Sequence, residues 1–231
     1  MEVLGKALRL LTTGDSEVYF LAFSTARFAI ISVLISSAIG IPIGLLLAFG
    51  SFPGRKALSI IFNAAMAVPT VVIGLFVYSL FARTGVFGRA PILFTPVAVV
   101  VGQALFAIPV VVSLTTSGLD RIDRRFGETL FTLGIVGYRR YLFGFREAAD
   151  EIFHAVLASF GRVVGEVGIS MMLGGNIRWY TRTLTTAIVL ETGKGNFEFA
   201  MALGVILLGI AVIINAIVQI IAERIRSGKH D

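Results

Sequence analysis

An arginine and a glutamate stand four residues apart in an otherwise apolar stretch, FGRVVGEVGISMMLGGN, residues 160–176. On an α-helix, residues three and four apart share a face, so Arg162 and Glu166 would form an ion pair, with Ser159 and Ser170 on the same stripe. A charge inside a bilayer costs about 3 kcal/mol, so this stripe must face protein or water. The pair either holds helices together or borders the route of a charged substrate. Since a neutralised arginine is a poor anion ligand, the pairing argues against direct contact between Arg162 and a substrate.

A second polar stretch, GGNIRWYTRTLTTAIVLE, follows at residues 174–191. Arg178 and Arg182 supply positive charge, and Asn176 and Thr181 supply hydrogen-bonding groups. Such groups suit an oxyanion that must be received and released. The same residues would also suit a solvated loop that binds a partner, and the sequence leaves both interpretations open.

The sequence indicates no metal site and no catalytic residue. It contains no cysteine, which excludes thiol catalysis and thiolate metal sites, and its two histidines, His154 and His230, have no companions at metal-ligand spacing. It also lacks the phosphate-binding motif G-x-x-x-x-G-K-[ST]. At residues 188–195 an isoleucine takes the first-glycine position and a glycine takes the final position. Any ATP hydrolysis must therefore occur on another chain, and we expect this chain to be no enzyme.

The composition places these residues in a membrane protein. The chain is 56% hydrophobic and only 15% charged, which leaves too few polar side chains to cover a water-soluble globule. A bilayer core about 30 Å thick requires about 20 apolar residues for each helical crossing. Uncharged runs of this length occupy residues 28–49, 57–81, 92–116 and 199–222, and residues 152–173 form a fifth if Arg162 and Glu166 are tolerated. We expect an all-α, polytopic membrane bundle of five transmembrane helices, with residues 1–231 as one domain.

The distribution of lysine and arginine predicts the orientation of this bundle. The loop at about 118–151 alone contains Arg121, Arg124, Arg125, Arg139, Arg140 and Arg146. By the positive-inside rule, this loop and the C-terminus lie in the cytoplasm and the N-terminus lies outside. The basic residues either anchor the topology or bind a partner, and charge alone favours the anchoring role. Two parts of the loop, at 128–133 and 138–143, have the pattern of short helices. Residues 1–17 fit an interfacial helix and a frayed terminus equally.

Three stretches resemble the membrane subunits of ATP-binding cassette importers, in particular the tungstate permeases and their molybdate and sulfate relatives. GRVVGEVGISMMLGGNI, followed by TRTLTTAIVLE, is similar to the tungstate subgroup. SFPGRK, ahead of an apolar run with Pro69, is similar to the corresponding turn of molybdate-type permeases. ETLFTLG places Glu128 and Gly134 at the spacing of the family's cytoplasmic signature loop, although Thr129 and Leu130 replace its usual alanines.

This resemblance implies a type I importer permease in the cytoplasmic membrane. It implies a homodimer around one route, cytoplasmic ATPase subunits that carry ATP and Mg, and an extracytoplasmic oxyanion-binding protein. The implied ATPase-coupling residues are Phe126, Glu128, Phe131, Gly134 and Tyr138. We expect no cofactor on this chain and no nucleic-acid partner. The predicted function is import of an oxyanion, with tungstate the first candidate. The alternatives are a permease for molybdate or another oxyanion, and a secondary transporter or channel.

Overall fold

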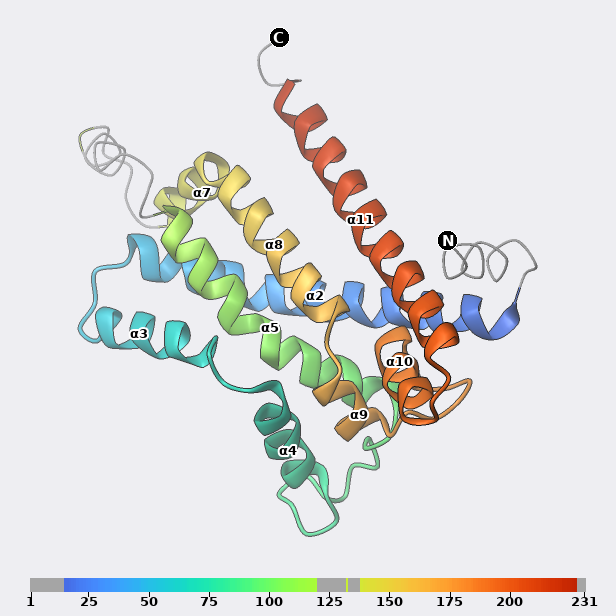
Figure 1. The fold of residues 1–231 in the computed structure, drawn as a ribbon. Helices are drawn as coiled ribbons and strands as arrows, with labels where there is room; N and C mark the ends of the chain where they lie inside the picture. Colours follow the sequence, from blue (N-terminus) through green and yellow to red (C-terminus); the bar gives the residue numbers. More distant parts are fainter. Residues whose placement is uncertain (1–14, 120–131, 133–137, 228–231) are drawn as a thin grey trace.

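The computed structural model describes residues 15–119, 132 and 138–227, which form helices joined by turns (Figure 1). Within these ranges no strand occurs, which confirms the all-α prediction. The helices are α2 (Ser16–Phe49), α3 (Arg55–Ala65), α4 (Thr70–Phe81), α5 (Pro96–Leu119), α7 (Tyr138–Glu147), α8 (Ala149–Val164), α9 (Gly168–Gly174), α10 (Leu184–Gly193) and α11 (Phe197–Ser227).

The long helices α2 and α5 pack against each other at the centre of the bundle. Glycines on α2 allow this approach, because a Cβ atom at Gly44 would lie 2.7 Å from Cβ of Thr115, and one at Gly40 would lie 2.9 Å from Cβ of Val111. In the most apolar stretch of 18 residues, 67% of the residues of α5 are buried, whereas only 17% of those of α11 are buried. Helix α5 is therefore the central span, and α11 lies at the edge.

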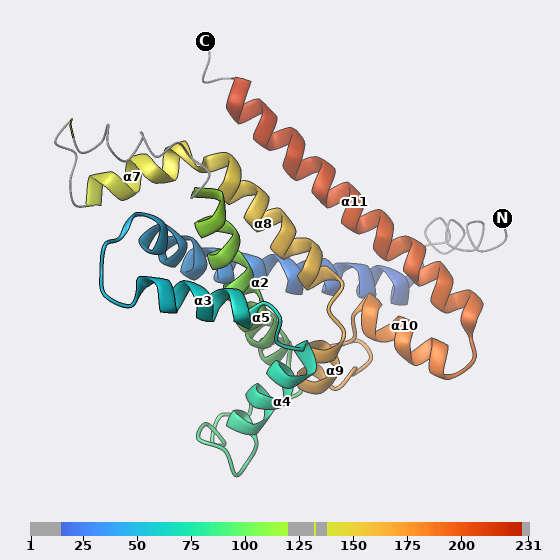
Figure 2. The ribbon, with the colours of Figure 1, turned by 60° about the vertical axis from the view of Figure 1, so that its left-hand side comes forward.

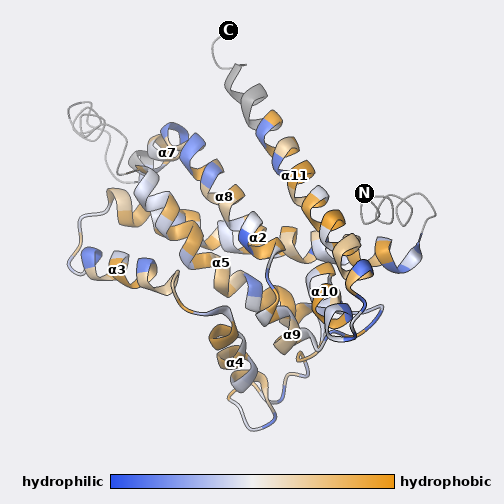
Figure 3. Cartoon of the chain, in the orientation of Figure 1, coloured by the Kyte–Doolittle hydropathy of each residue, from blue (hydrophilic) through white to orange (hydrophobic). Residues whose placement is uncertain are grey.

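The exposed face of α11 is composed of large apolar side chains, as expected of a helix in contact with lipid. Figure 3 shows the helix coloured mostly as hydrophobic along its described length. The exposed side chains on this face include Met201, Leu208, Val212, Ile213, Ile217 and Ile220. In water such a face would be unfavourable, so this face of α11 has the character of a surface in contact with lipid.

The described residues contain three helices that are long and apolar enough to cross a membrane, and up to five spans if each of two bent helix pairs counts as one. The prediction of five spans is confirmed in this sense. Two of the predicted spans are broken: α3 and α4 meet at 102°, and α8 and α9 meet at 60°. Both views show α4 leaving the line of α3 at a sharp angle (Figures 1 and 2).

Each break has a local cause. Pro69, at the start of α4, has no N–H to continue the hydrogen-bond ladder of α3, and the turn before it closes with a bond from the N–H of Val68 to the carbonyl of Ala65. The second break follows Gly165, the residue that caps the C-terminal end of α8. Glycine has no side chain to stabilise a helix interior.

The first span begins earlier than predicted. Helix α2 starts at Ser16 instead of residue 28, because the Asp15 carboxylate caps it by accepting the N–H groups of Glu17 and Val18 at 2.9 and 3.1 Å. Arg27 therefore lies inside the helix, on its exposed side. The predicted helix at 138–143 is confirmed as part of α7.

Candidate functional site

Arg162 lies in the last turn of α8, beside both helix breaks. Its side chain is exposed, its Nη2 donates to the carbonyl of Met66 at 3.4 Å, and its Cζ lies 5.2 Å from the centre of the Phe106 ring. Met66 belongs to the turn between α3 and α4, and Phe106 belongs to the central helix α5. At about 1.5 Å per residue, Arg162 is about 20 Å along α8 from its start.

Glu166 lies beyond the end of α8 and does not pair with Arg162. Within the described part of the chain, no ion pair joins these two residues. The Glu166 carboxylate is buried, with 7% of the residue exposed, and its Oε1 accepts the N–H of Ile169 at 3.0 Å in the first turn of α9. The predicted ion pair is therefore corrected. Its four-residue spacing assumed one continuous helix, and the chain bends by 60° between the two residues.

A buried chain of hydrogen bonds supports the break between α8 and α9. Gln103 of α5 is 3% exposed; its Nε2 donates to Ser170 at 3.2 Å and its Oε1 accepts from Ser32 of α2 at 3.0 Å. The hydroxyls of Ser170 and Thr185 donate to the carbonyl of Glu166 at 3.3 and 3.0 Å. Helices α9 and α10 therefore satisfy the Glu166 carbonyl at the break, and Gln103 of α5 holds Ser170 in place.

Gln103 was missed by the sequence analysis, although it carried a signal. It is the one amide side chain in the uncharged run 92–116. A polar group at such a position must find a partner inside the protein.

The two faces of α8 differ in character. Ser159, predicted on the stripe of Arg162, is fully buried instead, and its hydroxyl has no hydrogen-bond partner among the described residues. The open face carries His154, Ala158, Gly161, Arg162 and Gly165, and a Cβ atom at Gly161 would have nothing within 4 Å. Apart from His154 and Arg162, this face is made of small residues, unlike the bulky apolar face of α11.

The predicted residues on the other polar stretch form a cluster around a glutamate. Glu17 pairs with Arg178 at 2.6 Å and with Arg182 at 3.3 Å, and Nε of Arg182 donates to Oδ1 of Asn176 at 3.2 Å. The hydrogen bond and negative charge of Glu17 raise the pKa of Arg178 above its usual value. The sequence analysis missed Glu17, which stands 161 residues from Arg178.

Thr181, the fourth predicted residue of this stretch, is fully buried. Its hydroxyl donates to the carbonyl of Gly174 and accepts the N–H of Ile177 at 3.0 Å. It holds the turn between α9 and α10 in shape, and both arginines of the cluster are positioned by that turn.

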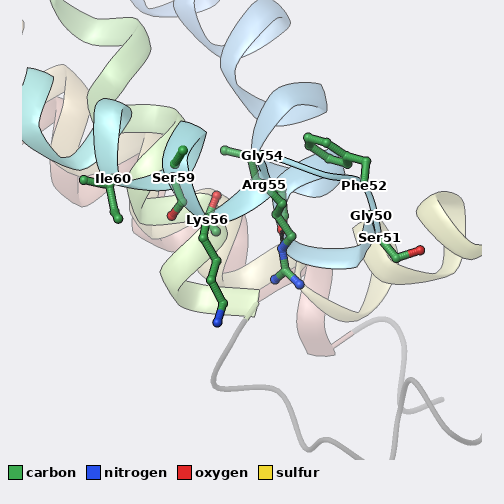
Figure 4. Close-up of a pocket in the computed structure, with 11 residues that line it drawn as sticks. Gly50, Ser51, Phe52, Gly54, Arg55, Lys56, Ser59 and Ile60 are labelled. Atoms are coloured by element: carbon green, nitrogen blue, oxygen red, sulfur yellow. Dashed lines mark hydrogen bonds between the residues drawn. The ribbon is translucent and has the colours of Figure 1, made fainter.

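At the opposite end of the bundle, a cavity of about 850 Å³ opens where α2 turns into α3 (Figure 4). Arg55 and Lys56 lie at its rim, and Figure 4 shows their side chains directed to the same side. Arg55 also donates through Nε to the carbonyl of Leu47. The turn that the resemblance indicated at SFPGRK is present, and Gly54 adopts φ +89°, a conformation that favours glycine.

The predicted coupling loop is described only in part. Tyr138 is the first residue of α7 and is 75% exposed. Phe126, Glu128, Phe131 and Gly134 lie outside the described residues.

Comparison with known proteins places these features in context. A family described as "Binding-protein-dependent transport system inner membrane component" matches residues 40–227. The chain is 37% identical to a probable anion ABC transporter permease protein of Haloferax volcanii, over 88% of this chain and 91% of the relative. It is 32% identical to the tungstate uptake system permease protein TupB of Peptoclostridium acidaminophilum, over 94% of this chain and 95% of the relative.

The fold is also that of a solved transporter. The chain superposes on a chain of the inward-facing MetNI methionine ABC transporter with a TM-score of 0.70, covering 92% of this chain and 97% of that one. The sequence identity is 19%, so this likeness concerns the fold.

Proposed function

Because the chain belongs to the family of binding-protein-dependent transport system inner membrane components, we propose that it forms the membrane route of an importer for an oxyanion. Tungstate is the first candidate substrate, since a relative of almost equal extent is named as a tungstate uptake permease. The relative named as an anion permease supports the same class of substrate. The observation that carries the proposal is the match over nearly the whole chain, together with an exposed arginine between two broken spans.

The proposed complex contains two copies of this chain, cytoplasmic ATPase subunits that carry ATP and Mg, and an extracytoplasmic binding protein. The family description supports dependence on a binding protein, and the missing phosphate-binding motif supports a separate ATPase. In this arrangement the N-terminus lies outside, and the end of the bundle with α7 faces the cytoplasm. The basic loop supports that orientation.

The proposed mechanism is alternating access, with α7 as the element that receives the movement of the ATPase. Helix α7 leads directly into α8 through Ala148, which is fully buried against Leu45, Leu119 and Ile152. A displacement of α7 therefore passes to α8 and reaches the break after Gly165. Nucleotide binding would bias two arrangements of this element and so expose the route to one side and then the other.

The substrate is tested by competition. The chain is reconstituted in proteoliposomes with its ATPase and binding protein, and ATP-dependent uptake of labelled tungstate is measured with excess unlabelled molybdate or sulfate. We expect tungstate uptake to persist against sulfate and to fall most with unlabelled tungstate. Stronger inhibition by molybdate than by tungstate would transfer the assignment to molybdate, and uptake of none of these anions would reject an oxyanion importer.

A further inference from the structure

The Arg162 guanidinium is an exposed cation within a membrane-spanning segment. Its contacts are the Met66 carbonyl and the Phe106 ring, and the described residues provide no carboxylate within ion-pair distance. Its expected partner, Glu166, is instead buried and bonded to Ile169. Glu166 therefore does not neutralise Arg162, and the guanidinium can contact an anion directly.

Lipid cannot be what covers this cation. An arginine facing acyl chains is strongly unfavourable, so it must face water or protein. The open face around it consists of His154, Ala158, Gly161 and Gly165, with space at Gly161 for a further atom. The lipid-type face of α11 has large apolar side chains instead. The two faces therefore have different surroundings, and that of α8 fits an aqueous route.

The contacts of Arg162 orient its guanidinium without using all of it. One Nη2 contact at 3.4 Å goes to the Met66 carbonyl, and Cζ lies over the Phe106 ring at 5.2 Å from its centre. A guanidinium has several N–H donors in a fixed fork, which matches two oxygens of an oxyanion. A single cation gives an attraction that is weak enough for release, as a passage site requires.

From these contacts we propose that Arg162 binds the travelling oxyanion part-way across the membrane, at the meeting of the two broken spans. The identity of the anion rests on the proposed function, whereas the exposure of the cation to solution rests on geometry alone. The site would take a tetrahedral oxyanion through two oxygens, and it would release the anion when α3, α4 and α8 change their arrangement.

The chain contains no cysteine, so single cysteines can probe the open face directly. Ala158→Cys places a thiol one helical turn from Arg162. In the full complex in nanodiscs, its rates with an anionic and a cationic methanethiosulfonate are measured relative to those of a small thiol in solution. We expect about a tenfold preference for the anionic reagent, from unit charges about 6 Å apart in water. The preference should vanish in Ala158→Cys/Arg162→Gln, and tungstate should slow labelling only when Arg162 is present.

Two results would overturn the proposal. A thiol at position 158 that reacts in no nucleotide state would mean that protein covers the face, for example a second copy of this chain. A charge preference that survives Arg162→Gln would mean that the cation faces away from the solution. Leu208→Cys on the lipid-type face of α11 is the matched control and should react at least tenfold more slowly.

Uptake supplies the second readout. We expect Arg162→Gln to lower tungstate uptake at least tenfold, Arg162→Lys to restore part of it, and Arg89→Gln, at an exposed cation in the turn between α4 and α5, to change it less than twofold. Equal losses in Arg162→Gln and Arg162→Lys would contradict a role based on charge. If the unaltered complex transports no oxyanion, the proposed function fails, while the charge preference of labelling still decides whether Arg162 faces the solution.

Discussion

Glu166 determines how the fourth span can break without leaving polar backbone groups unsatisfied. Its carboxylate accepts the N–H of Ile169, and its own carbonyl accepts the hydroxyls of Ser170 and Thr185. Acceptors at the start of a helix are favourable, because the first N–H groups have no helical partner. Glu166 therefore caps α9 and links the break to α9 and α10 through hydrogen bonds.

Glu166→Ala should lower the free energy of unfolding by about 1–3 kcal/mol, because the buried N–H of Ile169 loses its acceptor. Glu166→Gln should lower it less, since the amide oxygen can still accept that N–H. Thermal unfolding of the purified chain in one detergent compares the two variants. Equal losses would show that the charge of Glu166, and not its hydrogen bond, stabilises the break.

A pH effect is expected outside the spans, at the end of α10. Glu191 accepts Nζ of Lys194 at 2.7 Å and Nδ2 of Asn196 at 3.1 Å, and the Lys194 bond lowers the pKa of Glu191 below its ordinary value of 4.5. A lowered carboxyl pKa stabilises the fold above pH 4.5, and this contribution disappears as the pH falls through the folded-state pKa. Unfolding temperatures from pH 4 to 7 should show that Glu191→Gln is less stable than the unaltered chain near pH 7. The difference in unfolding temperature between the two proteins should become smaller toward pH 4. A difference that grows toward pH 4 would contradict a lowered pKa of Glu191.

At the scale of elements, the long uncharged runs were sufficient to predict the number of spans. They did not predict the breaks, because the rule for residues three and four apart assumes an intact helix. Pro69 was a visible signal for the first break, whereas Gly165 was one glycine among several in its stretch. The start of α2 was misplaced for a related reason: the uncharged run begins after Arg27, and a helix tolerates an exposed arginine among its apolar residues.

The contact between α5 and α9 depends on a glycine. A Cβ atom at Gly102 would lie 2.6 Å from Cγ2 of Ile169 and would also clash with Leu173. Gly102→Ala should therefore destabilise the chain by about 1–3 kcal/mol through overpacking. Gly204→Ala on α11, where a Cβ atom would have nothing within 4 Å, should be neutral or slightly stabilising. Thermal unfolding of both variants checks this contrast. Equal effects would show that the close contact of α5 with α9 does not depend on Gly102.

At the scale of the whole molecule, the described helices connect two ends with different chemistry. One end carries the Glu17 cluster with its two arginines, and the other carries α7 and the basic cavity of α2 and α3. The broken spans lie between them, with Arg162 exposed on the side of α8. The composition was sufficient to predict a membrane bundle. It did not predict the separation of Arg162 from Glu166, because hydrogen bonds between residues far apart in the sequence support the bend, from Gln103 to Ser170 and from Thr185 to Glu166.

The central claim is that this chain passes an oxyanion across a membrane when a separate ATPase drives it. The most direct measurement is the initial rate of tungstate uptake into proteoliposomes that contain the chain, its ATPase and its binding protein. The account predicts uptake that requires ATP and both partners and that stops when the phosphate-binding lysine of the ATPase is replaced. Uptake driven by an ion gradient, without ATP and by this chain alone, would contradict it.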